Sequence, residues 1–512
     1  MDADVIIIGT GAGGGTLARV LACAGLKLLL LERGDFLHRA KSNWEPEAVF
    51  HQHAYHTTER WLDREGTPFR PVTGYHVGGN TKLYGAAVLR RRERDFTALR
   101  HAGGETVPWP VRYAELAPFY DVAEEWYFAH GRRGEDPTEP PAGGPFPYPP
   151  VSHEPAIERV FHRLQACGLH PFHFPLAIHL DEARYAASPC IRCDTCDGFP
   201  CLVQAKGDAE ISAIRPALAH ADVLLKTGLR VTRLQSSADG RRVVAVQGES
   251  KHGTESFTAR VVVLAAGAVN SAALLLASAN DVHPRGLAND SDQVGRNYMC
   301  HLNSVMLALS PWRSNSTVFQ KTIGVNDYYF DSGDPRFPYP LGHVQLLGKV
   351  TGAVLKAQRP ALPRVAADWF GRHSVDWWLT TEDLARPDNR VTVTDSGQIR
   401  LNYTPNNVEA HTRLLAAWRT VLRRIGFSFL FSQTLGIEGV AHQVGTARFG
   451  ADPAQSVLDP YCRAHALDNL FVVDGSFMPS IAAVNPSLTI MAQALRVGEY
   501  LKARFARGDW HA

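Results

Sequence analysis

The 512-residue sequence lacks several features that would assign it to a specialised class. No apolar run approaches the ~20 residues that a membrane helix needs. The first strand-like run begins at residue 4, with no basic segment or cleavage site of a secretory signal before it. The formal net charge is only +2, so the positive field typical of nucleic-acid-binding proteins is missing. We therefore expect a cytoplasmic globular protein that binds neither a membrane nor nucleic acid.

Cysteine is scarce, with eight in the whole chain, which excludes a scaffold held together by disulfides. Four of them nevertheless crowd into one segment: Cys190, Cys193, Cys196 and Cys201. Their spacing is compatible with an iron–sulfur or zinc site. Local disulfides or packed free thiols are the alternatives, although a cytoplasmic location disfavours stable disulfides. The sequence leaves open whether a metal binds here.

The overall composition is that of an ordinary globular protein, with 45% hydrophobic and 20% charged residues. A chain of this length allows roughly two or three domains, or one large intertwined unit. The one basic cluster runs from Arg90 to Arg94 and is partly offset by Glu93 and Asp95. Charge runs of this kind usually lie on a solvated helix face, and we predict one here.

A dinucleotide-binding unit opens the chain. Residues 4–8 form a short apolar run, as expected of a parallel strand covered on both faces, and a helical stretch and a second strand at 27–31 follow. The turn after the first strand has the GxGxxG pattern, and an acid ends the second strand: Gly9, Gly11, Gly14 and Glu32. The glycines let the backbone approach a pyrophosphate at the helix N-terminus, and the acid is placed to accept hydrogen bonds from a ribose.

A second candidate nucleotide-binding turn, again at the end of a strand, lies far downstream in the sequence. Residues 259–267 read as a buried strand that ends in small residues, Ala266 and Gly267, and a helix follows through Ser278. Val231, which follows a turn at Gly228, is a further candidate contact. Simple NAD-dependent dehydrogenases do not usually need this second element, whereas flavoproteins with two dinucleotide folds commonly show it. The pair of turns therefore favours FAD.

Two glycine-rich segments carry less specific signals. Gly78, Gly79 and Asn80 open a run of small residues that would let backbone lie against a planar ligand, or would simply form a tight loop. Residues 131–150 are so rich in proline and glycine that we predict an extended, irregular arm. The arm could be a flap over a site, which we slightly favour, or a surface excursion.

Residues 311–430 differ in character from the rest. They are dense in aromatic residues and read as a hairpin around 395–397 followed by an amphipathic helix over 408–425. Most of the aromatic side chains are expected in the core, while several could stack on a sugar ring. We predict a discontinuous cofactor domain over 1–95, 196–310 and 431–512. An inserted, sheet-based substrate domain would comprise 96–195, with the arm at 131–150, and 311–430.

Taken together, these motifs resemble the glucose–methanol–choline (GMC) family of FAD oxidoreductases along essentially the whole chain. The resemblance implies an α/β fold: a Rossmann-like FAD-binding domain of discontinuous segments with an inserted sheet-based domain, as in p-hydroxybenzoate hydroxylase. Residues 482–489 are similar to a GxxNPxLT motif of pyranose oxidases, with alanine in place of the glycine. Bacterial pyranose oxidases and glycoside 3-oxidases are the nearest group. Fungal pyranose oxidases tether FAD through a histidine, and Leu83 stands at the matching position, so we expect non-covalent FAD.

The resemblance implies oxidation of a secondary hydroxyl by hydride transfer to flavin N5. His442 would be the general base, and Asn485 would hydrogen-bond the same hydroxyl oxygen. The flavin would be held near the closing turn and last helix, by Asp474, Gly475, Pro486 and Thr489. The expected substrate is a small sugar or glycoside, with O2 as acceptor and H2O2 as product.

Other functions and assemblies remain open at this level. A sugar or alcohol dehydrogenase that uses a quinone or protein acceptor is the alternative within the enzyme class. A non-catalytic dinucleotide-binding redox sensor, with Cys190–Cys201 as its working part, is the alternative outside it. The sequence does not specify the sugar or the ring position, and an oligomer is possible.

Overall fold

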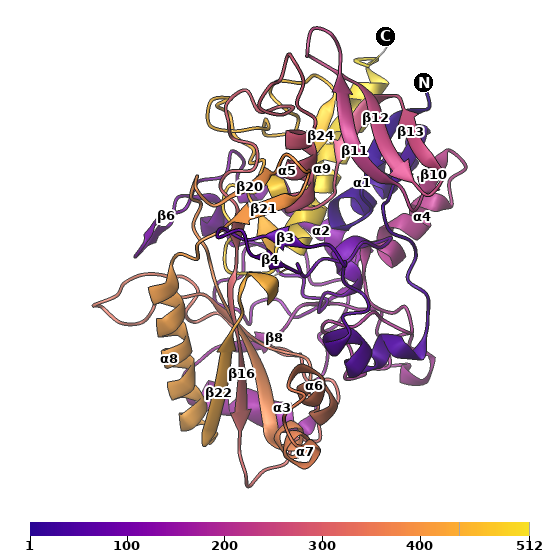
Figure 1. Cartoon of the computed structure of the whole chain (residues 1–512). Coiled ribbons are helices and arrows are strands. Elements are labelled where there is room, and N and C mark those ends of the chain that lie inside the picture. Colours follow the sequence, from indigo (N-terminus) through magenta and orange to yellow (C-terminus); the bar gives the residue numbers. More distant parts are fainter. Residues whose placement is uncertain (440, 511–512) are drawn as a thin grey trace.

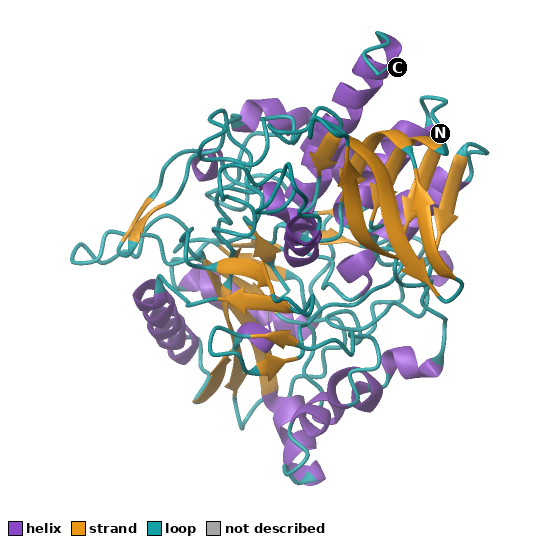
Figure 2. Cartoon of the chain, turned by 45° about the horizontal axis from the view of Figure 1, so that its top comes forward, coloured by secondary structure: helices purple, strands orange, loops and turns teal. Residues whose placement is uncertain are grey.

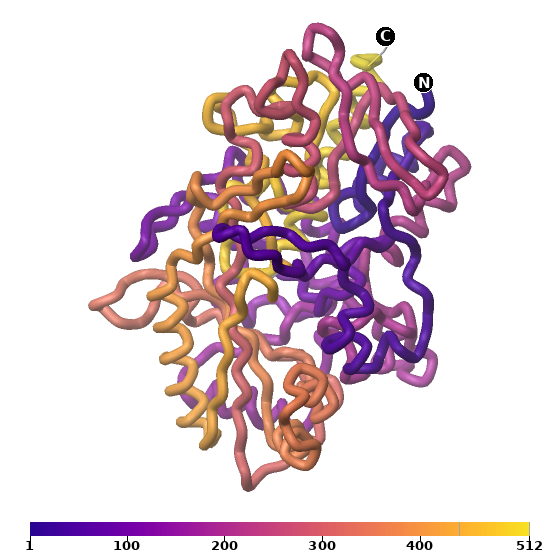
Figure 3. Tube along the Cα trace, in the orientation of Figure 1, coloured from indigo at the N-terminus to yellow at the C-terminus, as the bar shows by residue number. Residues whose placement is uncertain are grey.

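The computed structural model describes residues 1–439 and 441–510. Two sheets of different kinds organise the chain, one in each half of the view in Figure 1. The chain begins and ends in the same half, where the indigo and yellow parts of the trace lie close together in Figure 3. The middle of the chain supplies most of the other half, as expected for a cofactor domain built from separated segments.

The first sheet consists of five parallel strands in the described part of the chain, with β1 in the centre. Its strands, in spatial order, are β10 (Val223–Lys226), β2 (Leu28–Leu31), β1 (Ala3–Ile8), β14 (Ala259–Leu264) and β24 (Leu470–Val472). β1 and β14 are almost wholly apolar and buried, because other elements of the fold cover both faces of the sheet. The N-terminal strand thus pairs with a strand from the middle of the chain, and that strand pairs with one near the end.

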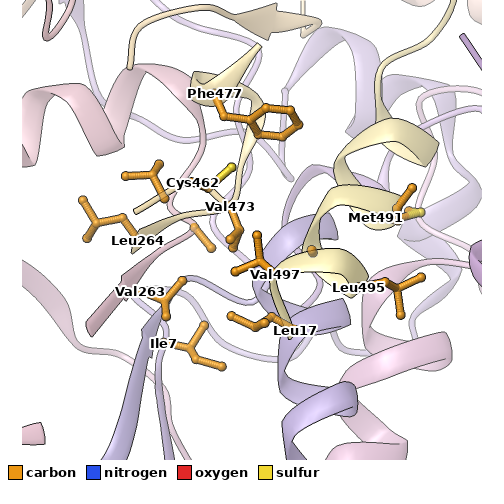
Figure 4. Packing of buried hydrophobic residues seen from close by; sticks show 14 of the residues in the cluster. Ile7, Leu17, Val263, Leu264, Cys462, Val473, Phe477, Met491, Leu495 and Val497 are labelled. Atoms are coloured by element: carbon orange, nitrogen blue, oxygen red, sulfur yellow. The ribbon is translucent and has the colours of Figure 1, made fainter. Parts of the chain in front are cut away.

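Helices pack closely on this sheet. They are α1 (Ala12–Ala22), α2 (Tyr113–Trp126), α5 (Ala268–Ala277) and α9 (Ser487–Ala506). A Cβ on Gly498 of α9 would lie 2.7 Å from Val20 of α1, so the two helices meet at a glycine. Figure 4 shows part of this core, where Leu17 and Val497 lie near Ile7 and Val263 of the strands. No helix within the described residues has the length and apolar character to cross a membrane.

A small antiparallel sheet flanks the parallel one. It contains β11 (Arg230–Ser236), β12 (Val243–Ser250) and β13 (Gly253–Phe257), and its strands curve across the upper right of Figure 2. β11 contacts α5: the Leu234 N–H donates to the Ser278 hydroxyl at 2.9 Å and Arg233 donates to the Ala279 carbonyl at 2.7 Å, both at the C-terminal end of that helix.

The second large sheet has six strands among the residues that the structure covers. Their spatial order is β22 (Phe429–Thr434), β16 (Leu302–Leu309), β19 (Ser374–Thr381), β18 (His343–Leu346), β17 (Ile323–Val325) and β8 (Pro171–His173). One face packs on α8 (Val408–Arg424), where Trp377 and Trp418 stack edge-on with ring centroids 4.8 Å apart. Successive residues of a strand point to opposite faces, so the neighbouring Trp378 points away from this core. β8 and β16 lie wholly before segment 311–430, and β22 runs past its end.

Short elements join the two halves. The two-residue strands β15 (Met299–Cys300) and β23 (Gln443–Val444) pair antiparallel. The predicted hairpin is confirmed as β20 (Arg390–Val393) and β21 (Ile399–Asn402), which extends to β3 (Trp61–Leu62) and β4 (Pro68–Phe69). The predicted amphipathic helix is confirmed as α8. Helices α3 (Pro155–Ala166), α6 (Gly352–Gln358) and α7 (Arg364–His373) cover the far end of the six-stranded half.

The prediction of a solvated helix face at the arginine run was wrong. Arg90, Arg91 and Arg92 are all nearly fully buried. Arg90 makes a bidentate ion pair with Glu124 of α2, at 2.6 and 2.7 Å, and Arg92 pairs with Asp136. Carboxylates from other segments neutralise Arg90 and Arg92, whereas Arg91 donates to the Ser480 and Ile481 carbonyls. Charge spacing along the chain cannot reveal such partners.

The arm at 131–150 is irregular, as predicted, but it is fastened to the protein. Arg133 pairs with Glu124, at 2.5 Å, and with Glu139, at 2.8 Å, while the Tyr113 hydroxyl donates to the Pro141 carbonyl. None of the arm residues lines the large cavity described below. The arm is therefore a packed strap and not a flap over that cavity.

Candidate active site

A large cavity lies between the two halves, with a volume of about 1540 Å³. Its walls come from the glycine turns of the parallel sheet on one side and from the six-stranded sheet on the other. Pockets for one small ligand usually have volumes of about 300–1,000 Å³. The cavity therefore has room for a large cofactor together with a substrate.

The first glycine turn presents bare backbone to the cavity. Gly9 has φ +98°, and a Cβ there would lie 2.4 Å from the Ala265 carbonyl oxygen. A Cβ on Gly14 would lie 2.0 Å from the Gly9 oxygen. Gly11 is the N-cap of α1 and lines the cavity. The turn is thus too close to β14 for side chains, and the helix N-terminus is exposed to a ligand's anionic groups.

Glu32 ends β2 at the cavity wall, as predicted. Its carboxylate accepts from the Thr10 hydroxyl at 2.7 Å, from the Thr10 backbone N–H at 3.1 Å and from the Gly34 N–H at 3.0 Å. Burial raises the pKa of this carboxyl, and these hydrogen bonds oppose the rise. The contacts orient the acid toward the place where a ribose would lie.

Asp474 connects the second turn to the closing one. One carboxylate oxygen accepts from the Gly267 N–H at 2.9 Å and the Ser271 hydroxyl at 2.5 Å. The other accepts from the Ser476 N–H at 2.9 Å. The carboxylate therefore holds the ends of β14 and β24 together, beside Gly475, which lines the cavity.

The Gly-Gly-Asn segment forms the third backbone surface. Gly78 and Gly79 both have positive φ, +96° and +56°. The Asn80 side chain accepts from the Gly74 N–H at 2.9 Å. Lys82 anchors the segment from behind through buried ion pairs with Asp208, at 2.9 Å, and Glu210, at 2.6 Å. Ion pairs with residues far away in the sequence therefore fix the conformation of this loop, whose glycines alone would allow several conformations.

The predicted cofactor residues divide into two groups. The lining of the cavity includes Gly9, Gly11, Glu32, Gly79, Asn80, Val231, Ala266, Gly267, Asp474, Gly475 and Pro486. Gly14, Gly78 and Thr489 lie behind this surface. The Gly78 N–H donates to the Thr10 hydroxyl at 3.2 Å, and the Thr489 hydroxyl bonds the Tyr120 hydroxyl at 2.8 Å. These three residues support the wall and do not line it.

His442 and Asn485 line the same cavity from different segments. His442 immediately precedes β23, and its Nδ1 lies 2.9 Å from Nδ1 of His301. Burial, and to a lesser extent the nearby Lys321 ammonium, together lower the pKa of His442 to about 4. Asn485 precedes Pro486, the N-cap of α9. Its amide has no hydrogen-bond partner among the described residues, so it is available to a ligand.

The opposite wall consists of side chains that were not predicted as site residues. Asn303 of β16, Gln345 of β18 and Trp378 of β19 line it, and Lys321 lies beside them. Lys321 makes an ion pair with Asp197 at 2.6 Å. The available sequence signal was a lone amide in β16 and another in β18. Nothing local indicates that these strands face His442, because their pairing is long-range.

The cysteine segment lies beside the cavity. All four of its cysteines are free thiols, so the structure contains none of the disulfides considered above. Within the described residues, no group of three or more histidine, cysteine, aspartate or glutamate side chains could hold a metal ion. Asp194, Asp197 and Phe199 of this segment line the cavity. The loop therefore contributes acids and an aromatic ring to the wall.

The comparisons with known proteins agree with this geometry. Residues 178–303 and 386–494 match the two sequence profiles described as GMC oxidoreductase. Paromamine 6'-oxidase of Streptomyces fradiae is 32% identical, over 96% of this chain and 90% of the relative. The chain belongs to the GMC oxidoreductase family. A second relative of this GMC oxidoreductase, 6'''-hydroxyparomomycin C oxidase of Streptomyces lividus, is 31% identical, over 98% of this chain and 92% of the relative.

The same fold occurs in a solved oxidase structure. The crystal structure of pyridoxine 4-oxidase from Mesorbium loti superposes with a TM-score of 0.68 at 21% identity, covering 97% of this chain and 98% of the other. The expected α/β fold and the GMC resemblance are therefore confirmed. This GMC oxidoreductase is a FAD-dependent enzyme that acts on CH–OH groups.

The residues present fit FAD. A Cβ on Gly267, at φ +89°, would meet nothing within 4 Å. The backbone of this turn therefore faces open space in which a ligand can approach it. The N-termini of α1 and α5 both lie at the cavity, and Glu32, at the end of β2, lines the same cavity. Together they supply the backbone donors and the acid that a dinucleotide requires.

Proposed function

We propose that this enzyme oxidises a secondary hydroxyl of a sugar or glycoside to a keto-sugar, with O2 as acceptor and H2O2 as product. The supporting observation is that His442 and Asn485 line one cavity, opposite a wall of Asn303, Gln345 and Trp378, and that the Asn485 amide has no hydrogen-bond partner among the described residues. The two relatives named as oxidases of paromamine and hydroxyparomomycin C support a sugar-containing substrate.

His442 is the general base in this proposal. With a pKa lowered to about 4, its imidazole is neutral at ordinary pH and can accept the proton of the substrate hydroxyl. FAD, when bound, accepts the hydride from the carbon that bears this hydroxyl. The Asn485 amide donates to the same oxygen, which orients it and stabilises the charge that develops as the proton leaves.

The six-stranded sheet orients the sugar. Asn303 and Gln345 offer amides that can donate to and accept from ring hydroxyls, whereas the Trp378 indole offers a flat apolar face to ring C–H groups. Lys321 and Asp197 neutralise one another at the same wall, so the pair presents little net charge to the substrate.

FAD is bound without a covalent bond in this proposal. Leu83, at the position where fungal pyranose oxidases attach the flavin, lines the cavity and has no nucleophilic atom. Denaturation with acid should release all of the flavin into the supernatant. Flavin that stays with the precipitated protein would contradict this.

The proposal is tested by anaerobic stopped-flow reduction of the enzyme-bound flavin with a panel of monosaccharides, glycosides, aminoglycosides and simple alcohols. A sugar or glycoside should bleach the flavin fastest. With that substrate, His442→Ala should retain FAD but lower the reduction rate by about 10²–10⁴. His51→Ala, an exposed histidine at the same cavity, is the matched control and should stay near the wild-type rate. An unchanged rate in His442→Ala would remove His442 from the mechanism.

The acceptor is tested separately, by comparing reoxidation with O2 and with a quinone. Rapid reoxidation by O2 with stoichiometric H2O2 is the expected result. Reoxidation by the quinone alone would assign the enzyme to the dehydrogenase alternative. A preparation that contains no FAD and responds to thiol reagents would instead support the redox-sensor alternative.

A further inference from the structure

His301 and His442 are cross-strand neighbours. The ladder of β15 and β23 pairs Met299 with Val444 and Cys300 with Gln443. Continued by one residue, this register places His301 opposite His442. The two imidazoles lie perpendicular, at 89°, with their Nδ1 atoms 2.9 Å apart. His301 is 1% exposed, so this contact is closed to solvent.

The second ring nitrogen of His301 determines where the protons lie. His301 Nε2 is 2.8 Å from the Ala482 carbonyl oxygen. A carbonyl oxygen only accepts hydrogen bonds, so His301 Nε2 carries a hydrogen. In a neutral imidazole the other nitrogen then has a lone pair. His301 Nδ1 must therefore accept, and His442 Nδ1 must donate.

His301 is neutral in this environment. Burial lowers its pKa well below the ordinary value, and the positive charges of a protonated His442, of Arg91 and of a protonated His343 oppose its protonation further. Glu382, one of the carboxylates around this loop, accepts from the Ala482 N–H at 2.6 Å. The acid is thus engaged on the loop and not on the His301 ring.

We propose that His301 is a positioning residue that holds His442 in the tautomer protonated at Nδ1, so that Nε2 of His442 is free to take the substrate's hydroxyl proton. This inference rests on the proposed role of His442 as the base. The hydrogen bond between the two rings is also preserved during proton transfer. His442 Nδ1 donates to His301 both before and after Nε2 gains the proton, so no hydrogen bond is lost during transfer.

The same ring restrains the loop that leads to Asn485. Ala482 has φ +57° and replaces the glycine of the related motif. Its carbonyl accepts from His301 and its N–H donates to Glu382. Arg91 donates to the Ser480 and Ile481 carbonyls at 2.9 and 2.7 Å. His301 therefore connects the base to the loop that carries the amide.

Two substitutions at position 301 separate the role of the acceptor from that of packing. His301→Asn keeps an oxygen where Nδ1 lies and can still accept from His442, whereas His301→Leu has no acceptor. In the FAD-loaded enzyme at saturating substrate, His301→Leu should lower the anaerobic flavin-reduction rate by about 10- to 100-fold, part of the contribution of a general base. His301→Asn should recover most of that loss, and substrate KM should change less than about threefold in both. Equal rates in the two variants across the pH range would overturn the proposal.

A second measurement needs no variant at position 301. Nitrogen NMR of ¹⁵N-histidine-labelled holoenzyme reports which ring nitrogen carries the proton, and a difference spectrum against His442→Gln assigns the His442 signals. The expected result is a protonated Nδ1 and an unprotonated Nε2 for His442. A protonated Nε2 would overturn the inference. If His442→Ala is fully active, the proposed function fails; if it is inactive while His301→Leu matches wild type, only the role of His301 fails.

Discussion

The two sheets that enclose the cavity contribute to it in opposite ways. The parallel sheet presents backbone: the turns at Gly9, Gly79 and Gly267 approach so closely, or at such φ angles, that side chains are excluded. The antiparallel sheet presents side chains, among them Asn303, Gln345 and Trp378. The backbone wall can bind a dinucleotide and has little freedom to vary. Single substitutions in the side-chain wall can change which substrate the enzyme accepts.

The largest expected effect is on the backbone wall. Gly9→Ala would place a Cβ 2.4 Å from the Ala265 oxygen at φ +98°, so we expect colourless or insoluble protein. Gly25→Ala is the control, because Gly25 has φ +66° but nothing within 4 Å. It should cost only about 1–3 kcal/mol of backbone strain and retain FAD. Flavin content and thermal unfolding should be measured for both variants. A yellow Gly9→Ala protein with wild-type Tm would contradict the assignment of this turn to the cofactor-binding wall.

The next effect concerns the amide beside the flavin site. Asn485→Ala should lower the anaerobic flavin-reduction rate by about 10²–10³, the usual value of one preorganised donor, with FAD content unchanged. Asn485→Asp keeps the size but removes the donor, and should be no faster than the alanine variant. Restored activity in Asn485→Asp would show that shape, not donation, is what the position supplies.

The side-chain wall should respond in KM. Gln345→Leu removes one amide from the cavity and should raise substrate KM by about 10-fold, which corresponds to one hydrogen bond of about 1.4 kcal/mol. Val344, the preceding residue, is fully buried in the core on the opposite face of the sheet. Val344→Ala should therefore lower Tm and leave KM unchanged. The reverse pattern in steady-state kinetics would show that the assigned strand faces are wrong.

A smaller effect is expected in the pH profile. Because the pKa of His442 is lowered to about 4, the base is neutral above that pH, and the reduction rate should fall as pH decreases through about 4. Lys321→Met removes a positive charge and should therefore raise the pKa of His442 and move this acid limb to higher pH. The pKa should return only part of the way to the ordinary value of histidine, because burial is the larger cause of the shift. Asp197→Asn leaves Lys321 without its partner and should not move the limb upward. A limb unmoved by Lys321→Met would contradict the electrostatic account.

The smallest effect should come from the cysteines. Cys193→Ser and Cys201→Ser should each leave the flavin-reduction rate within about twofold, since replacements away from special contacts change little. Metal analysis of the same preparations should find no stoichiometric metal. Loss of activity in either serine variant would reopen a role for the thiols.

The parallel sheet was predictable because its signals are local. Apolar runs, the Gly9–Gly14 turn and Glu32 follow one another within the span of a single βαβ unit. The hairpin of β20 and β21 and the helix α8 were equally local. The burial of Arg90–Arg92 was not, since it depends on acids such as Glu124 and Asp136 in other segments.

The side-chain wall escaped prediction for the same reason. Asn303 and Gln345 look like ordinary strand residues until the pairing of β16, β19 and β18 is known. His442 was expected only because a family motif contains it, and His301 had no such motif. Contacts between residues far apart in sequence, and not the residue types, define this part of the site.

The two-residue ladder of β15 and β23 has a consequence for how such an enzyme can diverge. His301 and His442 stand 141 positions apart, and almost the whole six-stranded sheet lies between them. Insertions and deletions within that span can reshape the substrate wall without disturbing the histidine pair. A one-residue slip of the ladder, in contrast, would turn one imidazole to the opposite face. Length variation is therefore tolerated on the substrate side and forbidden at four backbone positions, Met299, Cys300, Gln443 and Val444.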